Sequence, residues 1–157
     1  MQEGAITGKC SDSQVLTNLS GTGEIATNFY DAEENAITDD QLFGFLNVTI
    51  IAITTTSGLT EGILLAVRTD DATDLATAKD GTSAGYVVIG GVEIPKEEVI
   101  AGRQFSVPYR KDVGKKYFSA WYKAVNTAHV GTITVDAEFS NAPVGLNETI
   151  QKVRTSV

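Results

Sequence analysis

Cysteine and histidine are almost absent from this sequence: Cys10 and His129 are the single example of each in 157 residues. One cysteine cannot form an intrachain disulfide or supply the several thiolates of a zinc site. One histidine argues against metal centres in which several imidazole rings converge. No run approaches the roughly 18 consecutive apolar residues that span a bilayer, and the first residues lack the basic and then apolar pattern of a secretion signal. We therefore expect neither a metal site nor a membrane segment.

Positive charge is also scarce, since 12 Lys and Arg residues stand against 20 Asp and Glu residues, for a net charge of −8 and a pI near 4.5. Such a surface repels phosphate backbones, so nucleic acid is not an expected partner. The cationic residues cluster once, at Arg110, Lys111, Lys115 and Lys116. This cluster is either the solvated end of a hairpin or a contact with an acidic partner surface.

The remaining composition is that of an ordinary globular protein, with 42% apolar and 20% charged residues. The length suits one domain and is short for two. We predict a domain over residues 1–143, with a short N-terminal arm, and a C-terminal tail over residues 144–157. In the tail, Leu146, Ile150 and Val153 are spaced like one face of a helix. The tail is either a frayed end or an arm that docks on a neighbouring subunit.

The dominant pattern along the chain is an alternation with period two, which is typical of β-strands. In GTITVDAEF (131–139) every second residue is apolar, so one face is expected to be buried and the other wet. GRQFSVPY (102–109) alternates in the same way, and Pro108, which cannot donate to a ladder, predicts a strand end or an edge strand. The other predicted strands are SQVLTNL (13–19), GEIATNFY (23–30), FGFLNVTIIAITT (43–55), GILLAVRT (62–69), YVVIGG (86–91) and KYFSAWYKAV (116–125).

Two of these segments, 43–55 and 62–69, are apolar on both faces. They are expected to be buried on both sides, or on one side with a partner covering the other. Helix is expected only as short turns, in residues 69–81 and in IPKEEVIAG (94–102), where Pro95 would open the turn. Several short strands with turns between them and almost no helix predict an all-β fold, a β-sandwich or barrel.

One motif is suggestive of catalysis. GTSAG (81–85) matches the G-x-S-x-G pattern of a nucleophile elbow, and Asp112 and His129 follow Ser83 in the order found in α/β-hydrolases. The motif requires a strand before the serine and a helix after it, whereas here a possible helical turn precedes and a predicted strand follows. We therefore expect no hydrolase, and we expect His129 to be a replaceable loop residue.

The other polar patterns have plain interpretations. Acidic residues gather at 31–40 and 70–74 without the spacing of a calcium-binding loop, and no two carboxylates are singled out as a glycosidase pair. Of the sequons at Asn18, Asn47 and Asn147, the one at Asn47 falls inside a predicted strand, where a glycan would not fit. Trp121 is expected to anchor either the core or an interface.

Seven segments are similar, in sequence and in order, to a known family: SDSQVLT (11–17), LFGFLNVTI (42–50), GILLAVRTDD (62–71), VVIGGVEIP (87–95), AGRQFSVPY (101–109), KKYFSAWYKA (115–124) and GTITVDAEF (131–139). They resemble the small capsid decoration (cement) proteins of tailed bacteriophages, of the jelly-roll kind that sits as trimers on the outside of the head. The resemblance spans about residues 11–143. It lies in strand patterns without a catalytic signature, so no functional residue is carried over.

This resemblance implies a single-domain, jelly-roll-like β-sandwich with no enzymatic activity, metal or cofactor. It also implies a homotrimer that binds the major capsid protein on the outer surface of a virion assembled in the host cytoplasm. The interface candidates are Tyr109, Arg110, Tyr117, Trp121, Ile150 and Val153. The alternative is a carbohydrate- or receptor-binding β-sandwich of a phage head fibre or tail, in which Tyr109, Tyr117 and Trp121 would form one exposed aromatic face.

Overall fold

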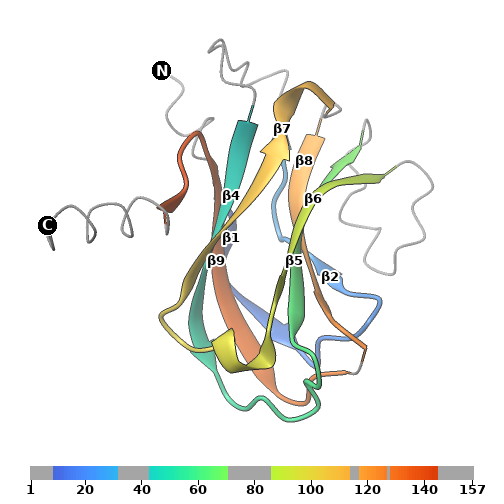
Figure 1. Ribbon diagram of the computed structural model, residues 1–157, viewed down its shortest axis with the longest axis vertical. Helices are drawn as coiled ribbons and strands as arrows, with labels where there is room; N and C mark the ends of the chain where they lie inside the picture. Colours follow the sequence, from blue (N-terminus) through green and yellow to red (C-terminus); the bar gives the residue numbers. More distant parts are fainter. Residues whose placement is uncertain (1–8, 32–42, 71–85, 114–116, 127, 145–157) are drawn as a thin grey trace, which may run out of the picture.

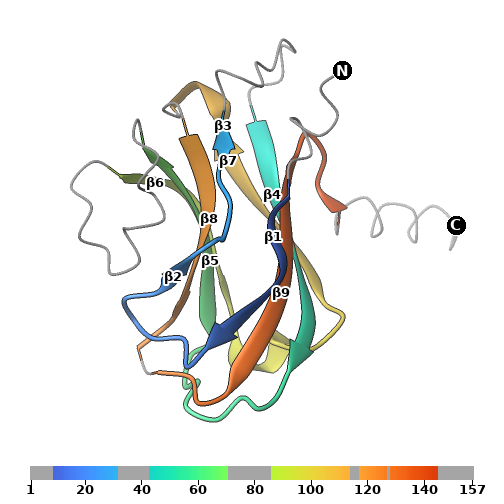
Figure 2. The ribbon, with the colours of Figure 1, turned by 180° about the vertical axis from the view of Figure 1, so that it is seen from behind.

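The computed structural model describes residues 9–31, 43–70, 86–113, 117–126 and 128–144 (Figure 1). Within them lie β1 (Lys9–Thr17), β2 (Glu24–Ile25), β3 (Tyr30–Asp31), β4 (Phe43–Ile53), β5 (Ile63–Asp70), β6 (Val87–Ile94), η3 (Lys96–Glu98), β7 (Gln104–Arg110), η4 (Lys111–Val113), β8 (Tyr117–Ala124) and β9 (Thr132–Ser140). The strands form two antiparallel sheets that pack face to face, seen from the opposite side in Figure 2. The predicted all-β sandwich is confirmed.

The strand order is that of a jelly roll. Sheet A has the order β1-β9-β4-β7, and sheet B has the order β2-β8-β5-β6, with β3 also paired to β8. The outermost strands of the sequence pair with each other, and the pairing then proceeds inward: β1 with β9, β2 with β8, β4 with β7, and β5 with β6. One long hairpin wound around itself in this way gives the two Greek keys of a jelly roll.

The core residues of the strands lie at the alternate positions that the period-two pattern predicted. Burial along β9 alternates residue by residue, and the apolar positions face sheet B. In β8, Phe118, Ala120 and Tyr122 face the core, while Tyr117 and Trp121 lie on the outer face of sheet B. β7 is an edge strand of sheet A with Pro108 exposed, so the edge-strand prediction from this proline is confirmed.

The two segments that are apolar on both faces, now β4 and β5, differ in how far their outer faces are buried. β5 is an inner strand of sheet B and is buried on both faces, since Ala66 and Arg68 on its outer face are as inaccessible as its core residues. The outer face of β4 is only partly buried, with Asn47 at 6% exposure in its middle. On its outer face, the side chains of Phe43 and Ile51 are 44% and 40% exposed. The outer face of sheet A thus exposes apolar side chains at Phe43 and Ile51.

One side of the sandwich is closed by the chain between β2 and β3, and the other by the contact of β6 with β7. The predicted strand 23–30 is divided into β2 and β3 because the chain between them turns to β1, where the Asn28 N–H donates to the Cys10 carbonyl. On the other side, β6 approaches β7 so closely that a Cβ at Gly90 would lie 2.5 Å from the Pro108 carbonyl oxygen. The turn predicted after Pro95 is the 3₁₀ helix η3, whereas the turn predicted at 69–81 lies almost wholly outside the described residues.

Candidate functional site

The interface candidate Tyr109 lies in the core. Its side chain is 4% exposed, and its ring contacts Phe118 and Phe139 at centroid distances of 5.6 and 5.7 Å. Burial raises the pKa of its phenol. The prediction of an exposed Tyr109 is therefore wrong, because this residue alternates with outward-facing Pro108 and Arg110 along β7.

Arg110 lies at the surface, as expected. Its guanidinium donates to both carboxylate oxygens of Asp112, at 3.0 and 2.5 Å. This bond lowers the pKa of Asp112 and raises the pKa of Arg110. The neighbouring Lys111 donates to the Asn141 amide oxygen at 2.7 Å, while Lys115 and Lys116 lie outside the described residues. These local pairings favour the interpretation of this cluster as a solvated hairpin end.

Trp121 stabilises a buried cation on the outer face of sheet B. The Arg68 guanidinium carbon lies 3.5 Å from the ring centroid of Tyr86 and 4.9 Å from that of Trp121, and Lys123 approaches the same indole at 5.5 Å. Burial lowers the pKa of Arg68. The indole Nε1 is buried against Gly23, with no hydrogen-bond acceptor among the described residues. Trp121 therefore contacts residues on the outer face of sheet B and does not pack in the core between the two sheets.

The aromatic face required by the sugar-binding alternative is not formed. Tyr117 packs edge-on against Phe29, with ring centroids 5.0 Å apart, and is 9% exposed. Tyr109 faces the opposite direction, into the core. The other two interface candidates, Ile150 and Val153, lie outside the described residues.

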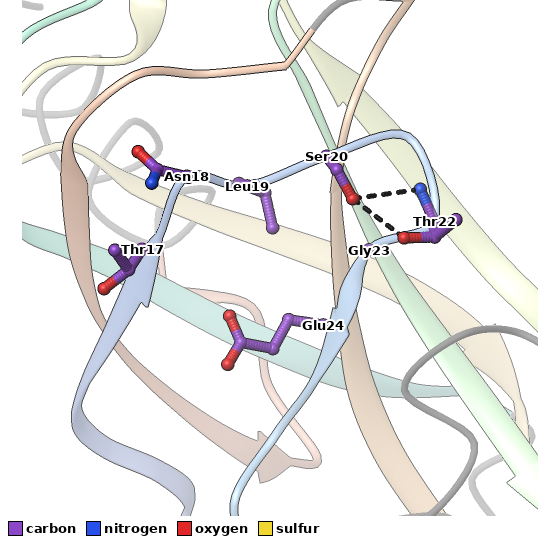
Figure 3. A pocket seen from close by; sticks show the side chains of 7 residues that line it. All are labelled: Thr17, Asn18, Leu19, Ser20, Thr22, Gly23 and Glu24. Carbon is purple, nitrogen blue, oxygen red and sulfur yellow. Dashed lines mark hydrogen bonds between the residues drawn. The ribbon is translucent and has the colours of Figure 1, made fainter.

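A hollow of about 360 Å³ lies beside the connection between β1 and β2 (Figure 3). Its lining residues are Thr17, Asn18, Leu19, Ser20, Thr22, Gly23 and Glu24. Ser20 and Thr22 bond each other through their hydroxyls at 2.8 Å, and the Asn18 side-chain oxygen accepts the Gly131 N–H at 3.0 Å. Glu24 is the one carboxylate in this lining and points into the arch of the loop. A single carboxylate among hydroxyls can bind a polar ligand but supplies no acid–base pair.

His129 is a loop residue between β8 and β9, as predicted, but it is fully buried. Its Nε2 is hydrogen-bonded to the Thr55 carbonyl, so Nε2 carries the hydrogen. Its backbone N–H donates to the Leu19 carbonyl at 2.8 Å. His129 therefore joins three loops at one end of the sandwich, and this burial argues against the expectation that it is replaceable.

The suggested catalytic triad is not brought together. Asp112 precedes β8 and His129 follows it, so the two side chains are separated by the length of that strand, about 25 Å. Ser83 lies outside the described residues. Within the described ranges, no group of three or more His, Cys, Asp or Glu side chains could hold a metal ion. Cys10 is buried against the core, which raises the pKa of its thiol to about 12.

Sequence reasoning missed a polar network on the outer face of sheet A. Asn47 of β4 and Ser106 of β7 lie opposite each other, and the Ser106 hydroxyl donates to the Asn47 amide oxygen at 2.7 Å. Asn47 Nδ2 donates to the Ala142 carbonyl at 3.0 Å, while the Val144 N–H donates to Ser106 Oγ at 3.0 Å. The chain after β9 is thereby fixed across this face. The one sign of this network in the sequence was Asn47, an amide side chain within the largely apolar segment 43–55.

Next to this network lies a smaller hollow of about 180 Å³. Lys9 pairs there with Asp136 at 3.3 Å and with Asp12 at 3.1 Å, and these bonds raise the pKa of Lys9. The residues that line the hollow are Lys9, Asn47, Thr49, Gln104, Asp136, Ala137, Glu138 and Val144. The outer face of sheet A thus combines apolar groups, ion pairs and the fixed C-terminal segment.

No protein-family model and no curated protein matches this chain. Among the described residues, no helix is long and apolar enough to cross a membrane. The functional assignment therefore depends on the fold and on the chemistry of its surfaces.

Proposed function

We propose that the protein is a structural virion component that binds the outside of a phage head and stabilises the shell, as a capsid decoration protein. In this proposal it assembles as a homotrimer and binds the major capsid protein. The observation that carries it is the partly apolar outer face of sheet A, where Phe43 and Ile51 are 44% and 40% exposed on a jelly-roll sandwich. A surface of this kind fits a protein that works by burying area on its neighbours.

The mechanism of such a protein is thermodynamic. A protein that binds the assembled shell and not the separate subunits shifts the assembly equilibrium toward the shell. Because many copies bind one shell, and each trimer would make several contacts, a modest affinity per contact is sufficient. The net charge of −8 keeps the unbound protein soluble and suits a location outside the shell, away from packaged DNA. No catalytic step is required.

Co-sedimentation with undecorated heads of the phage that carries this sequence tests the proposal. We expect the protein to pellet with the heads and to saturate at a fixed ratio to the major capsid protein. Ile51→Asp should weaken this binding at least tenfold, because it places a charge on the exposed apolar face. Val130→Asp is the control for a charge at an exposed valine, since Val130 is 59% exposed and lies in the loop before β9 instead of on β4. Absence of pelleting by the unmodified chain would contradict the proposal.

The second candidate is a carbohydrate- or receptor-binding module, and the hollow around Glu24 favours it (Figure 3). Its hydroxyl groups and single carboxylate could accept hydrogen bonds from a polyol. A glycan-binding screen with the unmodified chain and with Glu24→Gln separates the two candidates. Binding that is lost in Glu24→Gln, together with no binding to heads, would favour the second candidate.

A further inference from the structure

Two neighbouring rows of polar side chains cross the outer face of sheet A. The register of β1, β9, β4 and β7 forms one row from Lys9, Glu138, Asn47 and Ser106. The next row is formed by Asp136, Thr49 and Gln104. Residues two apart on a strand point to the same face, so the rows lie side by side. All of these residues except Ser106 line the hollow of about 180 Å³, which is far larger than one water requires and has room for a side-chain head group.

Glu138 is the carboxylate of this hollow that lacks a cation. Lys9 lies opposite Glu138 in the register, but its ammonium bonds Asp12 at 3.1 Å and Asp136 at 3.3 Å instead. The other oxygen of Asp136 accepts the Ser13 N–H at 2.6 Å. Among the residues that the structure describes, none forms an ion pair or hydrogen bond with the Glu138 side chain. Two carboxylates thus share one ammonium, and the charge of Glu138 is left over.

The backbone of β1 holds Lys9 away from Glu138. The pairing of β1 with β9 shifts register between Ser11 and Gln14, and Ser13 within this bulge has a φ of 49°. A residue other than glycine adopts such a left-handed conformation only where its surroundings fix it. Glu138 itself is half-buried. A carboxylate that has lost part of its hydration gains more from a cation than a fully exposed carboxylate does.

The other free groups in the hollow accept hydrogen bonds. Gln104 Nε2 donates to Thr49 Oγ1 at 3.5 Å, which leaves the Gln104 amide oxygen for a further donor. The Asn47 amide oxygen is already occupied by Ser106 and Val144. A complementary occupant therefore brings a positive charge and several N–H donors. A guanidinium has both, since it is planar, carries five donors and is more weakly hydrated than an ammonium.

We propose that this hollow binds the guanidinium of an arginine from a partner protein, paired with Glu138 and hydrogen-bonded to the Gln104 amide oxygen. The exposed side chains of Phe43 and Ile51 lie on β4 to either side of its polar positions, so apolar residues that flank the arginine are buried in the same contact. An arginine among apolar contacts is a common interface anchor. Assigning this arginine to the major capsid protein rests on the proposed function, whereas binding of a guanidinium does not.

Titration of the full-length protein with N-acetyl-arginine amide, followed by backbone amide shifts in two-dimensional NMR, tests the site without heads. We expect saturable shifts at residues of the two rows, with a millimolar dissociation constant. N-acetyl-citrulline amide, in which a neutral urea group replaces the guanidinium, should bind about tenfold more weakly. Glu138→Gln keeps the size of the side chain, removes its charge and should weaken binding of the arginine probe about tenfold. Glu93→Gln is the matched control, because Glu93 is an exposed strand glutamate of sheet B, and it should leave the affinity unchanged.

Three results would overturn the site: no saturable shift with the arginine probe, equal binding of the citrulline probe, which would indicate a site for neutral polar ligands, or equal binding by a folded Glu138→Gln protein. Co-sedimentation with heads is measured separately. If the probe binds as expected and the unmodified chain does not bind heads, only the proposed function fails. If the unmodified chain and Glu138→Gln bind heads equally, the capsid protein does not supply the arginine, and the inference fails while the proposed function stands.

Discussion

The ring of Tyr109 lies directly over Gly44, the residue paired with it on the neighbouring strand β4. A Cβ at position 44 would come within 2.5 Å of both Cζ and Oη of the tyrosine. The absence of a side chain at Gly44 thus leaves the space in which Tyr109 joins the core aromatic rings. A residue that appeared suited to an interface by its type is instead part of the sandwich interior.

Gly44→Ala should therefore destabilise the protein, because the new methyl group displaces the tyrosine ring from its packed position. The expected loss of unfolding free energy is about 1–3 kcal/mol, as for other overpacked cores. Urea unfolding measures it. Gly21→Ala is the control, since a Cβ at Gly21 meets nothing within 4 Å, and it should change stability by less than about 0.5 kcal/mol. Equal stability of the two variants would refute this explanation of Tyr109.

The sequence pattern was sufficient to predict an all-β sandwich and to predict which side chains of strands such as β7 and β9 face its core. Alternation placed Tyr109 on the same side as Val107, and Pro108 marked an edge strand; both are confirmed. The interface assignment of Tyr109 failed because it was made from residue type alone, against this alternation. The period of a strand is fixed by backbone geometry, whereas the preference of tyrosine for interfaces is only statistical.

The polar residue in the apolar run marked Asn47 as unusual, but its partners could not be predicted because they depend on sheet register. Asn47 and Val144 are 97 residues apart, and they meet only because β4 lies between β7 and β9. The burial of His129 likewise follows from three loops that meet in space. One histidine among small and apolar loop residues gave no local sign of this contact.

A buried chain of hydroxyls gives a second prediction. Ser11 has one hydroxyl hydrogen, which it donates to Gln14 Oε1 at 2.7 Å, so the Tyr122 hydroxyl must donate to Ser11 Oγ at 2.7 Å. Ser11→Ala leaves the buried Tyr122 hydroxyl without its acceptor and should cost about 1–3 kcal/mol of stability. Tyr122→Phe removes the donor itself and should cost about 1 kcal/mol. Adding Tyr122→Phe to Ser11→Ala should then cost nothing further; additive losses in this double-mutant cycle would argue against the assigned direction.

Alkaline pH should destabilise the fold. The Cys10 thiol has its pKa raised from 9.0 to about 12, mainly by burial, and burial also raises the pKa values of Tyr109 and Tyr122. Above pH 9 the unfolded chain loses the thiol proton while the folded chain retains it, so stability present below pH 9 is lost progressively as the pH rises to about 12. Urea midpoints at pH 8 and pH 10.5 measure the decline. Cys10→Ala should show a smaller decline, and an identical slope in both proteins would contradict the role of the thiol.

His129→Ala should reduce stability without affecting binding to heads. The substitution removes the hydrogen bond to the Thr55 carbonyl and leaves a cavity where the buried imidazole packs among the loops, with an expected loss of about 1–3 kcal/mol. Thermal unfolding measures the loss, and co-sedimentation measures binding. Val130→Ala, at an exposed neighbouring position, serves as the control. Loss of head binding by a folded His129→Ala protein would show that this residue has a functional role after all.

The most direct measurement of the central claim is the temperature at which undecorated heads break open, recorded at increasing concentrations of the purified protein. Linkage predicts that this temperature rises as the protein binds and continues to rise with the logarithm of the free concentration. Ile51→Asp should require at least tenfold more protein for the same rise. If the protein binds the heads to saturation and the opening temperature does not change, the protein is not a stabiliser of the shell.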